Sequence, residues 1–431
     1  MDGTQGRQRI LVMAHAHPDF SLGGGEIAAY NLFRAYRADP AVEAAWFLGR
    51  VDRGHATPSG AIGLRRADEY TWDQGIGDWH MLRAAHRDSL LDGFAQLLRA
   101  LRPTVVHLHH YMHLGLEVLR VVRNELPDAR IVMTLHEYMA ICRNNGQMIK
   151  ADGKRLCSGA TPQECQACFP QQSVEDFWLR RHWFERHFDL VDRFVSPSAF
   201  LRQRYIEWGI APDRIEVIEN GQPGAPPLPP RALADGEPRN RFAFFGQVTP
   251  FKGLDVLFEA LAQLPDEARR RIVLEVHGAN LELQAEAYRE RVEALRADLH
   301  EDGVVQWVGP YQPSELRARM AAVDWVVVPS IWWENSPMVI QEAFECGRPL
   351  LVSDIGGMAE KVRDGVDGLH VAAGNRLAWG RALLRAAGET GLWDRLRSGI
   401  RAPADHAQAA RHHLDMLADR MPSPARDGAA A

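Results

Sequence analysis

The stretch WVVVPSIWWENSPMVIQEA, residues 325–343, decides the fold. It opens with an apolar run typical of a buried strand, passes through a polar turn and continues as a helix that begins near Ser336. A strand followed by a helix is the building unit of a parallel sheet that helices cover on both faces. The free N–H groups of this helix are expected at the carboxyl edge of the sheet, where such folds bind ligands and where anions are favoured.

The same unit recurs on both sides of this stretch. Short apolar runs alternate with amphipathic segments before and after a proline-rich stretch near the middle of the chain. This alternation predicts an α/β fold with two Rossmann-like, doubly wound parallel-sheet domains that face each other across a cleft. The predicted strands lie at residues 10–14, 44–48, 104–108, 131–134, 242–246, 272–278, 325–330 and 350–354.

The proline-rich stretch marks the domain boundary. Residues 221–240 read GQPGAPPLPPRALADGEPRN, which can hold neither a helix nor a central strand. We therefore expect an N-terminal domain over residues 1–221, a flexible linker over 222–240 and a C-terminal domain over 241–405. Residues 406–431 are expected to form a helix and tail that return to the N-terminal domain. Residues 52–80 are polar and glycine-rich, which predicts a long loop.

Composition restricts the kinds of partner that the protein is expected to bind and the compartment in which it is expected. The chain has 431 residues, with 46% hydrophobic and 25% charged, as in ordinary globular proteins. Fifty Lys and Arg against 56 Asp and Glu give a net charge of −6, which argues against nucleic acid as a partner. The early apolar run ILVMA is too short for a signal segment, and no stretch is long enough to span a membrane, so a cytoplasmic protein is expected.

Two glutamates lie near the start of this helix, one before it and one within it. Glu334 lies in the turn and Glu342 eight positions further on, inside the helix. Two carboxylates at this separation can hold hydroxyls at either end of one elongated ligand, whose phosphates would bind the N–H groups of Ser336, Met338 and Val339. The plainer alternative is that Glu334 is a surface turn residue and that Glu342 is an exposed carboxylate on the helix.

Two further motifs suit phosphate or sugar binding. In FFGQVTPFKGLD, residues 244–255, Lys252 stands at the start of a helix as a point charge for phosphate oxygens. The order differs from a P-loop, so an ATPase is not predicted. In the GGGE motif, Gly23, Gly24 and Gly25 let the backbone approach a ligand closely, although a tight strand-to-helix turn uses glycines too.

Together with PLLVSDIGGMAEKVRDGVDGL, residues 349–369, these motifs resemble the retaining glycosyltransferases of family 4, also called glycosyl transferases group 1. The resemblance runs from about residue 10 to residue 415. It implies the GT-B fold and transfer of a hexose, with retention, from a nucleotide-diphosphate sugar held by the second domain. The acceptor, a saccharide or a lipid-linked saccharide, would be held by the first domain, in polysaccharide or glycoconjugate assembly.

The resemblance also implies roles for single residues. Glu342 would bind the ribose of the donor, Glu334 a hydroxyl of the donor sugar, and Lys252 the diphosphate together with the helix N–H groups. Gln247 stands where the family commonly has Arg, so one phosphate-binding cation is missing or comes from elsewhere. No Asp-x-Asp follows a predicted strand, so catalysis is not expected to require a divalent metal.

Histidines gather at the ends of two predicted strands. His136 matches a family histidine near the donor sugar and the acceptor, which makes it a catalytic candidate with Glu334 and Lys252. The stretch VVHLHHYMHLG, residues 105–115, carries His107, His109, His110 and His113. The spacing of these four could suggest a metal site, but a neutral acceptor-side cluster is the plainer interpretation.

Four cysteines form a separate pattern, C-x14-C-x7-C-x2-C, at Cys142, Cys157, Cys165 and Cys168. Four thiols ending in Cys-x2-Cys can close a tetrahedral zinc site that pins a loop, which predicts a structural zinc. The alternative is a set of unrelated loop thiols.

Residues 174–194, VEDFWLRRHWFERHFDLVDRF, are aromatic and basic along a helix. Such a helix can seat a domain peripherally on a membrane that carries a lipid-linked acceptor. The alternative is a helix packed on the sheet with its arginines in water.

Three other functions fit the same fold. A nucleotide-sugar epimerase would need no acceptor, and a phosphorylase would carry pyridoxal phosphate. A catalytically silent nucleotide-sugar-binding protein would keep donor binding without transfer.

Overall fold

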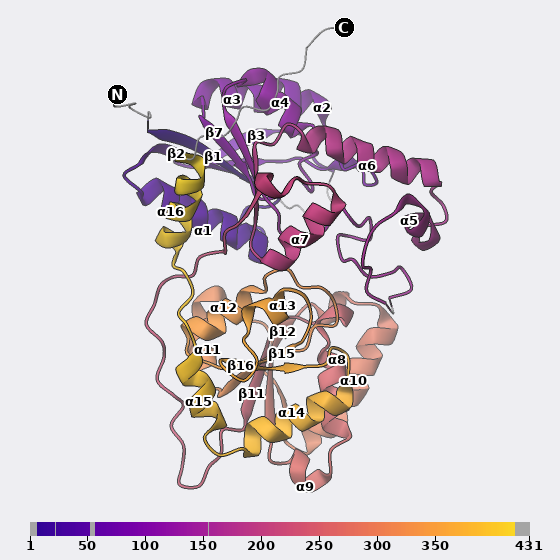
Figure 1. Cartoon of the computed structure of the whole chain (residues 1–431), viewed down its shortest axis with the longest axis vertical. Coiled ribbons are helices and arrows are strands. Elements are labelled where there is room, and N and C mark those ends of the chain that lie inside the picture. Colours follow the sequence, from indigo (N-terminus) through magenta and orange to yellow (C-terminus); the bar gives the residue numbers. More distant parts are fainter. Residues whose placement is uncertain (1–6, 22, 52–56, 154, 419–431) are drawn as a thin grey trace. The chain divides into compact units, whose positions relative to one another are not determined.

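A computed structural model describes residues 7–21, 23–51, 57–153 and 155–418. The chain forms two compact units: unit 1 contains the residues up to Gly221 and those from Ala404 onward, and unit 2 contains Gln222–Pro403 (Figure 1). Parts of two predicted segments, residues 52–56 of the loop and 419–431 of the tail, lie outside the described residues.

Unit 1 is built on an eight-stranded sheet in the order β10-β9-β8-β7-β1-β2-β4-β3. All neighbouring pairs are parallel except β3 and β4. β1 lies between β2 and β7, so the strand order reverses between β1 and β7. The strands are β1 (Gln8–Ala14), β2 (Val42–Arg50), β3 (Ile62–Arg66), β4 (Glu69–Trp72), β7 (Val105–Leu108), β8 (Arg130–Thr134), β9 (Arg193–Ser196) and β10 (Ile215–Val217), with a separate hairpin of β5 (Ile76–Asp78) and β6 (Arg83–Ala84).

Helices connect these strands. The strands β1, β7 and β8 are buried along most of their length, which is why they read as continuous apolar runs in the sequence. The helices are α1 (Gly24–Ala38), α2 (Arg87–Ser89), a π-helical turn (Leu90–Phe94), α3 (Ala95–Leu101), α4 (Val118–Glu125), α5 (Pro162–Cys168), α6 (Val174–Phe188), α7 (Ala199–Trp208) and α16 (His406–Ala418).

Unit 2 has a six-stranded parallel sheet in the order β13-β12-β11-β14-β15-β16. Counted from its first strand, this is the order 3-2-1-4-5-6 of dinucleotide-binding folds, with the reversal between β11 and β14. The strands are β11 (Arg241–Gln247), β12 (Val273–Ala279), β13 (Val305–Trp307), β14 (Trp325–Val328), β15 (Leu350–Ser353) and β16 (Gly368–Val371).

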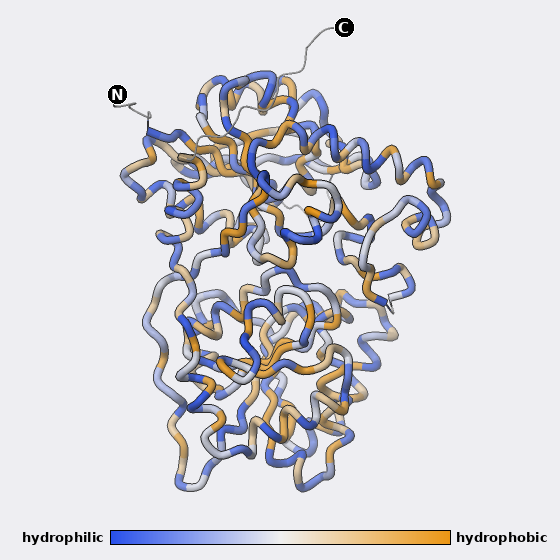
Figure 2. Tube along the Cα trace, viewed as in Figure 1, coloured by the Kyte–Doolittle hydropathy of each residue, from blue (hydrophilic) through white to orange (hydrophobic). Residues whose placement is uncertain are grey.

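Two apolar clusters cover the two faces of the unit 2 sheet, because alternate side chains of β11 and β14 point to opposite faces. Figure 2 shows hydrophobic colour along the central strands of each unit. The helices are α8 (Leu254–Ala262), α9 (Asp266–Arg269), α10 (Glu286–Glu301), α11 (Leu316–Ala321), α12 (Met338–Glu345), α13 (Gly356–Lys361), α14 (Arg376–Gly388) and α15 (Leu392–Gly399).

The prediction of a long loop over residues 52–80 is wrong. The described part of this segment contains β3, β4 and β5, and β4 extends the main sheet by pairing with β2. These strands are short, and most side chains of β3 are exposed, so the alternation that reveals a half-buried strand is missing.

The segment expected to be a flexible linker is anchored on unit 2. Glu345 accepts a hydrogen bond from the backbone N–H of Gly224 at 2.7 Å. The fully buried Arg348 donates to the carbonyl oxygen of Pro229 at 2.8 Å. Prolines prevent regular structure here, and side chains of unit 2 hold the extended backbone in place of secondary structure.

The final helix, α16, packs against α1 of unit 1. Arg411 forms an ion pair with Asp39 at 2.9 Å, and Leu414 and Leu417 join the apolar cluster of α1 and β1. No helix within the described ranges has the length and apolar character needed to cross a membrane.

Candidate active site

In unit 2, two loops meet where the strand order reverses. The loop after β11 carries Lys252, and the loop after β14 carries Glu334. The backbone N–H of Ile331 donates to the carbonyl oxygen of Phe251 at 2.9 Å and ties the two loops together. Ligands of open α/β sheets bind at this position, outside the carboxyl ends of the strands.

The backbone conformation and the surroundings of Gly253 explain why a glycine follows Lys252. Its φ is +69°, and a Cβ atom at this position would lie 2.1 Å from the carbonyl oxygen of Pro329. Glycine adopts this conformation without strain, and its missing Cβ allows the two backbones to approach so closely. The Lys-Gly pair therefore holds Lys252 against the loop that contains Glu334.

Lys252 and Glu334 form a direct ion pair. The Lys252 Nζ lies 2.6 Å from the Glu334 Oε1, which also accepts a hydrogen bond from the Ser330 hydroxyl at 2.8 Å. Glu334 is only 6% exposed, while about a third of the Lys252 side chain faces solvent. The predicted phosphate-binding cation and the predicted sugar-binding carboxylate are thus in contact.

The helix that follows, α12, begins at Met338, two residues later than predicted. Its N-cap residue is Pro337, which makes no side-chain capping hydrogen bond, and the backbone N–H groups of the first turn point toward the N-terminal end of the helix. Of the predicted donors, Met338 and Val339 lie in this first turn. The backbone N–H of Ser336 instead donates to the side chain of Asn335, and the buried Ser336 hydroxyl finds no hydrogen-bond partner among the described residues.

Glu342 lies on the second turn of α12 and is half-buried. Burial, together with the neighbouring carboxylate of Glu345, raises the pKa of Glu342 to about 7. Burial and the charge of Glu342 also raise the pKa of Tyr311, which places the phenol near this carboxyl. A carboxyl with this pKa ionises near neutral pH and can accept hydrogen bonds from ligand hydroxyls.

Gly356 and Gly357 pack against the turn that contains Glu334. The backbone N–H of Gly357 donates to the carbonyl oxygen of Glu334 at 2.7 Å. A Cβ atom on Gly357 would lie 1.8 Å from the carbonyl oxygen of Asn335. The glycines of the motif SDIGGMAE are therefore required for the close approach that fixes Glu334.

Gln247 is the last residue of β11 and is exposed. It lies five residues before Lys252, at the carboxyl end of the strand. Its amide carries no charge, so Lys252 is the cation that this loop offers to a phosphate.

In unit 1, the corresponding switch point brings histidines and the GGGE motif together. Gly23 precedes α1, while Gly24 and Gly25 form its start. A Cβ atom on Gly25 would lie 3.7 Å from ring atoms of both His15 and His136. The start of α1 therefore lies against the histidines that follow β1 and β8.

Glu26, which the sequence analysis did not select as a site residue, is a charged member of this cluster. Its carboxylate accepts a hydrogen bond from the Ser21 hydroxyl at 2.7 Å and lies 3.2 Å from the His15 Nε2. Burial alone would raise the pKa of Glu26, but the contacts with His15 and Ser21 lower it to about 2. Glu26 is therefore a buried anion next to His15.

His136 is paired with His109. The Nδ1 of His109 and the Nε2 of His136 are 3.0 Å apart, and the two rings are stacked. Burial, with His15 nearby, lowers the pKa of His136 to about 4. Both rings are neutral at physiological pH, because burial and neighbouring histidines also hold the pKa of His109 well below its usual range.

The other histidines after β7 serve different contacts. His107 lies 2.7 Å from the Thr134 hydroxyl, and the Nδ1 of His110 accepts the backbone N–H groups of Tyr111 and Met112. Burial holds the pKa values of His107 and His110 well below the usual range. Within the described part of the chain, no three side chains of His, Cys, Asp or Glu are arranged to hold a metal ion.

The same finding applies to the four predicted zinc ligands. Electrostatic interactions link Cys165 to the other three thiols, so Cys142, Cys157 and Cys168 lie in its neighbourhood. The Cys157 thiol donates to the carbonyl oxygen of Gly159 at 3.0 Å, and burial raises the pKa of Cys165 to about 12. The structure thus gathers the thiols in one region without forming the predicted coordination sphere.

Sequence reasoning missed several residues of both groups. His15 directly follows β1, Ser330 lies two residues after β14, and Glu26 lies in the first turn of α1, so position near an element end was an available signal. Tyr311 gave no such signal, because it lies four residues beyond the end of β13. Only the folded structure brings it near Glu342.

Comparisons with known proteins agree with this architecture. Residues 22–222 match the family model Glycosyltransferase Family 4, and residues 230–398 match Glycosyl transferases group 1. Among solved structures, Anabaena HepE in complex with UDP and glucose has a TM-score of 0.62 at 18% identity, covering 96% of this chain and 100% of that one. Sucrose-phosphate synthase from Thermosynechococcus elongatus has a TM-score of 0.68 at 18% identity, with 95% and 98% covered.

Curated relatives are named D-inositol 3-phosphate glycosyltransferase. The one from Nocardia farcinica is 34% identical over 231 residues, which is 50% of this chain and 49% of the relative. The one from Nocardioides is 26% identical over 331 residues, 72% of this chain and 66% of the relative. The chain spans about half the length of the first of these relatives. The two family matches, which together run from residue 22 to residue 398, nevertheless confirm the predicted family and fold: the chain belongs to glycosyltransferase family 4 and has the GT-B fold.

Proposed function

We propose that this protein is a retaining glycosyltransferase that moves a hexose from a nucleotide-diphosphate sugar to a saccharide or lipid-linked saccharide. In this proposal unit 2 binds the donor and unit 1 binds the acceptor. The observation that carries this proposal is the Lys252–Glu334 ion pair, formed where the loop before α12 meets the loop after β11, at the switch point of a 3-2-1-4-5-6 sheet.

This geometry suits a departing diphosphate. Cleavage of the bond between the sugar C1 and the phosphate oxygen develops negative charge on the phosphate. Lys252 and the N–H groups of Met338 and Val339 are fixed before the reaction, so they can stabilise this charge without reorganising. Complexes of the structural neighbour HepE with UDP and glucose support a nucleotide-sugar donor.

Glu334 and Glu342 then act as hydroxyl acceptors. Glu334 would accept a hydrogen bond from a hydroxyl of the sugar, and Glu342 would accept hydrogen bonds from the ribose hydroxyls. The acceptor hydroxyl attacks C1 on the face that the phosphate leaves, and its proton passes to the departing phosphate. No protein nucleophile is needed, and a neutral His136 would orient a sugar hydroxyl by hydrogen bonding.

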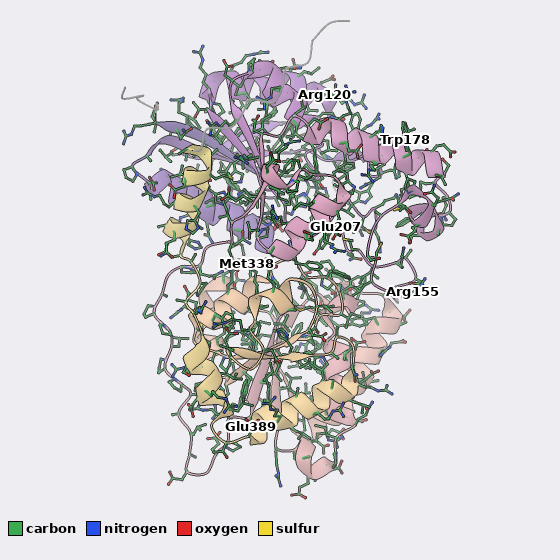
Figure 3. The ribbon with its side chains drawn as sticks, in the orientation of Figure 1. Arg120, Arg155, Trp178, Glu207, Met338 and Glu389 are labelled. Atoms are coloured by element: carbon green, nitrogen blue, oxygen red, sulfur yellow. The ribbon has the colours of Figure 1, made fainter. Side chains whose placement is uncertain are left out.

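A lipid-linked acceptor would bring the protein to a membrane surface, and α6 offers an apolar contact. Trp178 and Leu179 of this helix are each about half exposed. Figure 3 marks the position of Trp178 on α6. Its opposite face is buried and includes Arg180, which donates to the backbone carbonyls of Met139 and Ala140. The expectation that the arginines of this helix all face water is therefore wrong at Arg180.

We expect the double variant Trp178→Ala and Leu179→Ala to bind vesicles of mixed phosphatidylcholine and phosphatidylglycerol about tenfold more weakly than the wild type, since it loses apolar area that would enter the interface. Cosedimentation measures this. The control is Leu377→Ala, an equally exposed leucine on α14. Wild-type protein that does not bind vesicles, or a double variant that binds like the wild type, contradicts membrane contact through α6.

A donor panel tests the function itself. We expect one UDP- or GDP-sugar to raise the melting temperature, and saccharide acceptors to accelerate release of the nucleoside diphosphate with retained anomeric configuration by NMR. An epimer formed from donor alone would assign an epimerase instead. Absorbance from bound pyridoxal phosphate would assign a phosphorylase, and binding with neither transfer nor slow hydrolysis would assign a silent binding protein.

A further inference from the structure

The helix α12 carries a second carboxylate, which contacts the linker. Glu345 lies three residues after Glu342 on α12 and is 7% exposed. Its Oε1 accepts hydrogen bonds from the backbone N–H groups of Gly224 and Ala225 at 2.7 and 3.0 Å. Its Oε2 lies 3.2 Å from a guanidinium nitrogen of Arg317 on α11. Glu345 is thus held jointly by the linker and by α11.

Arg317 holds the same part of the linker. Its second guanidinium nitrogen donates to the carbonyl oxygen of Pro226 at 2.7 Å. The linker segment 224–226 therefore contacts both members of the Glu345–Arg317 ion pair. Gly224 has a φ of +76°, a conformation that glycine adopts without strain. Docking of this segment depends on that conformation and on the charge of Glu345, because a charged acceptor forms stronger hydrogen bonds.

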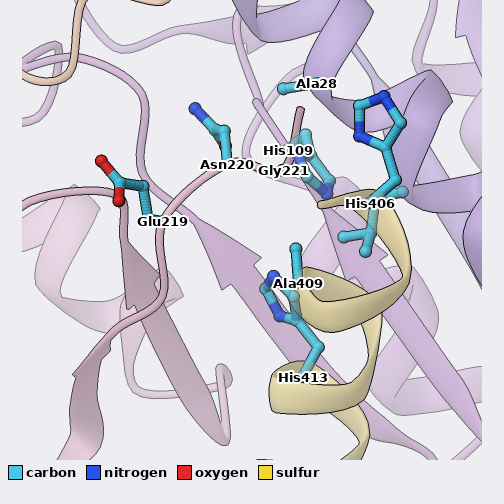
Figure 4. A pocket seen from close by; sticks show the side chains of 9 residues that line it. Ala28, His109, Glu219, Asn220, Gly221, His406, Ala409 and His413 are labelled. Atoms are coloured by element: carbon cyan, nitrogen blue, oxygen red, sulfur yellow. The ribbon is translucent and has the colours of Figure 1, made fainter. Parts of the chain in front are cut away.

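The chain is also fixed just before this segment. Gly221, the last residue of unit 1 before the linker, lies beside His406 at the start of α16 (Figure 4). A Cβ atom on Gly221 would lie 2.7 Å from the Cα atom of His406. A substitution at Gly224 is therefore expected to loosen the segment 224–226 without releasing Gly221.

Glu345 and Glu342 act on each other through their charges. Side chains three positions apart on a helix are neighbours, and like charges at this spacing repel. Burial and the carboxylate of Glu345 raise the pKa of Glu342 to about 7. Two further titratable groups lie beside Glu342, the Tyr311 phenol and the Cys346 thiol. Burial raises the pKa of both, so they are uncharged near neutral pH. Arg319 of α11 lies 5.6 Å from the centroid of the Tyr311 ring, and its charge is the same in every variant used below.

The docked linker lessens the repulsion between the two carboxylates. The two backbone N–H groups and Arg317 offset the charge of Glu345. When the segment 224–226 leaves, Glu345 loses two donors and Arg317 loses its contact with Pro226, so the charge that acts on Glu342 increases. A ligand that needs an ionised Glu342 therefore binds more tightly while the linker is docked, and by linkage it strengthens docking by the same factor.

We propose that Glu345 is a positioning residue that couples donor binding at Glu342 to docking of the linker segment 224–226 on α12. This inference rests on the proposed function in so far as Glu342 contacts the donor. The titration of Glu342 and the hydrogen exchange of the linker amides are properties of the free protein, and both can be measured without a ligand.

The first test removes the charge of Glu345 and keeps its size. We expect Glu345→Gln to lower the pKa of Glu342, which ¹³C NMR of the glutamate-labelled full chain measures, with the signal assigned by Glu342→Gln. For a decrease of about one pH unit, the ionised fraction at pH 6 rises about 5-fold, so the Kd for UDP or GDP, which share the ribose, falls about 5-fold. At pH 8 the Kd should change less than about 2-fold. A variant that only damaged the fold would bind more weakly at both pH values.

The matched control is Glu293→Gln. It removes an equal charge from an exposed position of α10, which packs on the opposite face of the sheet from α12. We expect neither the titration of Glu342 nor the nucleotide Kd to change in this variant. An effect as large as that of Glu345→Gln would contradict the role of Glu345.

The second test acts on the linker alone. Gly224→Ala strains the left-handed backbone, so we expect faster hydrogen exchange at residues 224 and 225 and a higher pKa of Glu342. A rise of about half a pH unit doubles the Kd at pH 7, by about 2-fold. The same substitution combined with Glu345→Gln should leave the Kd as in Glu345→Gln alone, because Gln carries no charge. Saturating UDP or GDP should slow exchange of both amides in the wild type and not in Glu345→Gln.

Three results overturn the proposal. The first is an unchanged titration of Glu342 in a folded Glu345→Gln. The second is an unchanged titration of Glu342 in Gly224→Ala although the linker amides exchange faster. The third is an equal effect of Gly224→Ala on the Kd with and without Glu345→Gln. If neither UDP nor GDP binds, the proposed donor site fails, and the two titrations still decide whether the linker and Glu342 are coupled.

Discussion

Lys252→Ala is expected to lower kcat at least about 10²-fold, or about 3 kcal/mol in transition-state stabilisation. The ammonium group of Lys252 is 2.6 Å from Glu334, which lies four residues before the start of α12, where the proposed diphosphate departs. Its loss removes the cation at the point where negative charge develops. Steady-state kinetics with the donor found in the panel measure the effect, with kcat separated from KM.

The variant also leaves Glu334, which is nearly buried, with Ser330 as its remaining side-chain partner. Its melting temperature must therefore be measured beside its activity, because an unpaired buried carboxylate destabilises the fold. Arg381→Ala removes an exposed positive charge from the same unit and should change kcat by less than about 2-fold. Wild-type turnover in Lys252→Ala, or an equal loss in Arg381→Ala, would remove Lys252 from the leaving-group role.

The fold was predictable from sequence where burial is complete. Strands such as β14 are apolar on both faces, and helix starts such as the one at Gly24 carry glycine, so type and order could be predicted. The edge strand β3 was missed because its side chains are exposed and leave no pattern. The anchored linker was missed because its partners, Glu345 and Arg348, lie more than a hundred residues away.

For the candidate site too, the sequence predicted single residues but not the contacts between them. The motifs indicated Lys252 and Glu334 separately, but their ion pair joins residues 82 positions apart and depends on the switch point between β11 and β14. Likewise, His136 could be selected at a strand end, whereas its contact with His109 depends on the pairing of neighbouring strands. Local spacing predicts which residue types stand at a strand end, and only the strand order decides which of them meet.

Glu342→Ala is expected to weaken donor binding about 10²-fold, or about 3 kcal/mol, through the loss of charge-assisted hydrogen bonds to two hydroxyls. The pKa of Glu342 near 7 adds a pH dependence, because only the ionised carboxylate accepts both hydroxyl protons. The ionised fraction falls about tenfold between pH 8 and pH 6, so the donor Kd should rise by the same factor. Isothermal titration calorimetry at the two pH values measures both effects.

Glu342→Gln separates binding from stability. The folded-state pKa of Glu342 lies above the ordinary 4.5, so the protonated form favours folding: this stabilisation is fully present below pH 4.5 and is lost as the pH rises through 7. Gln mimics the protonated carboxyl at every pH. The variant should therefore melt at a higher temperature than the wild type at pH 8, bind the donor more weakly, and lose the pH dependence of Kd.

Glu293→Gln, at an exposed position of α10, is the control and should leave the melting temperature, the donor affinity and its pH dependence unchanged. A variant that keeps wild-type donor affinity at pH 8 would show that Glu342 does not contact the ligand, and one that melts lower would show that its charge stabilises the fold.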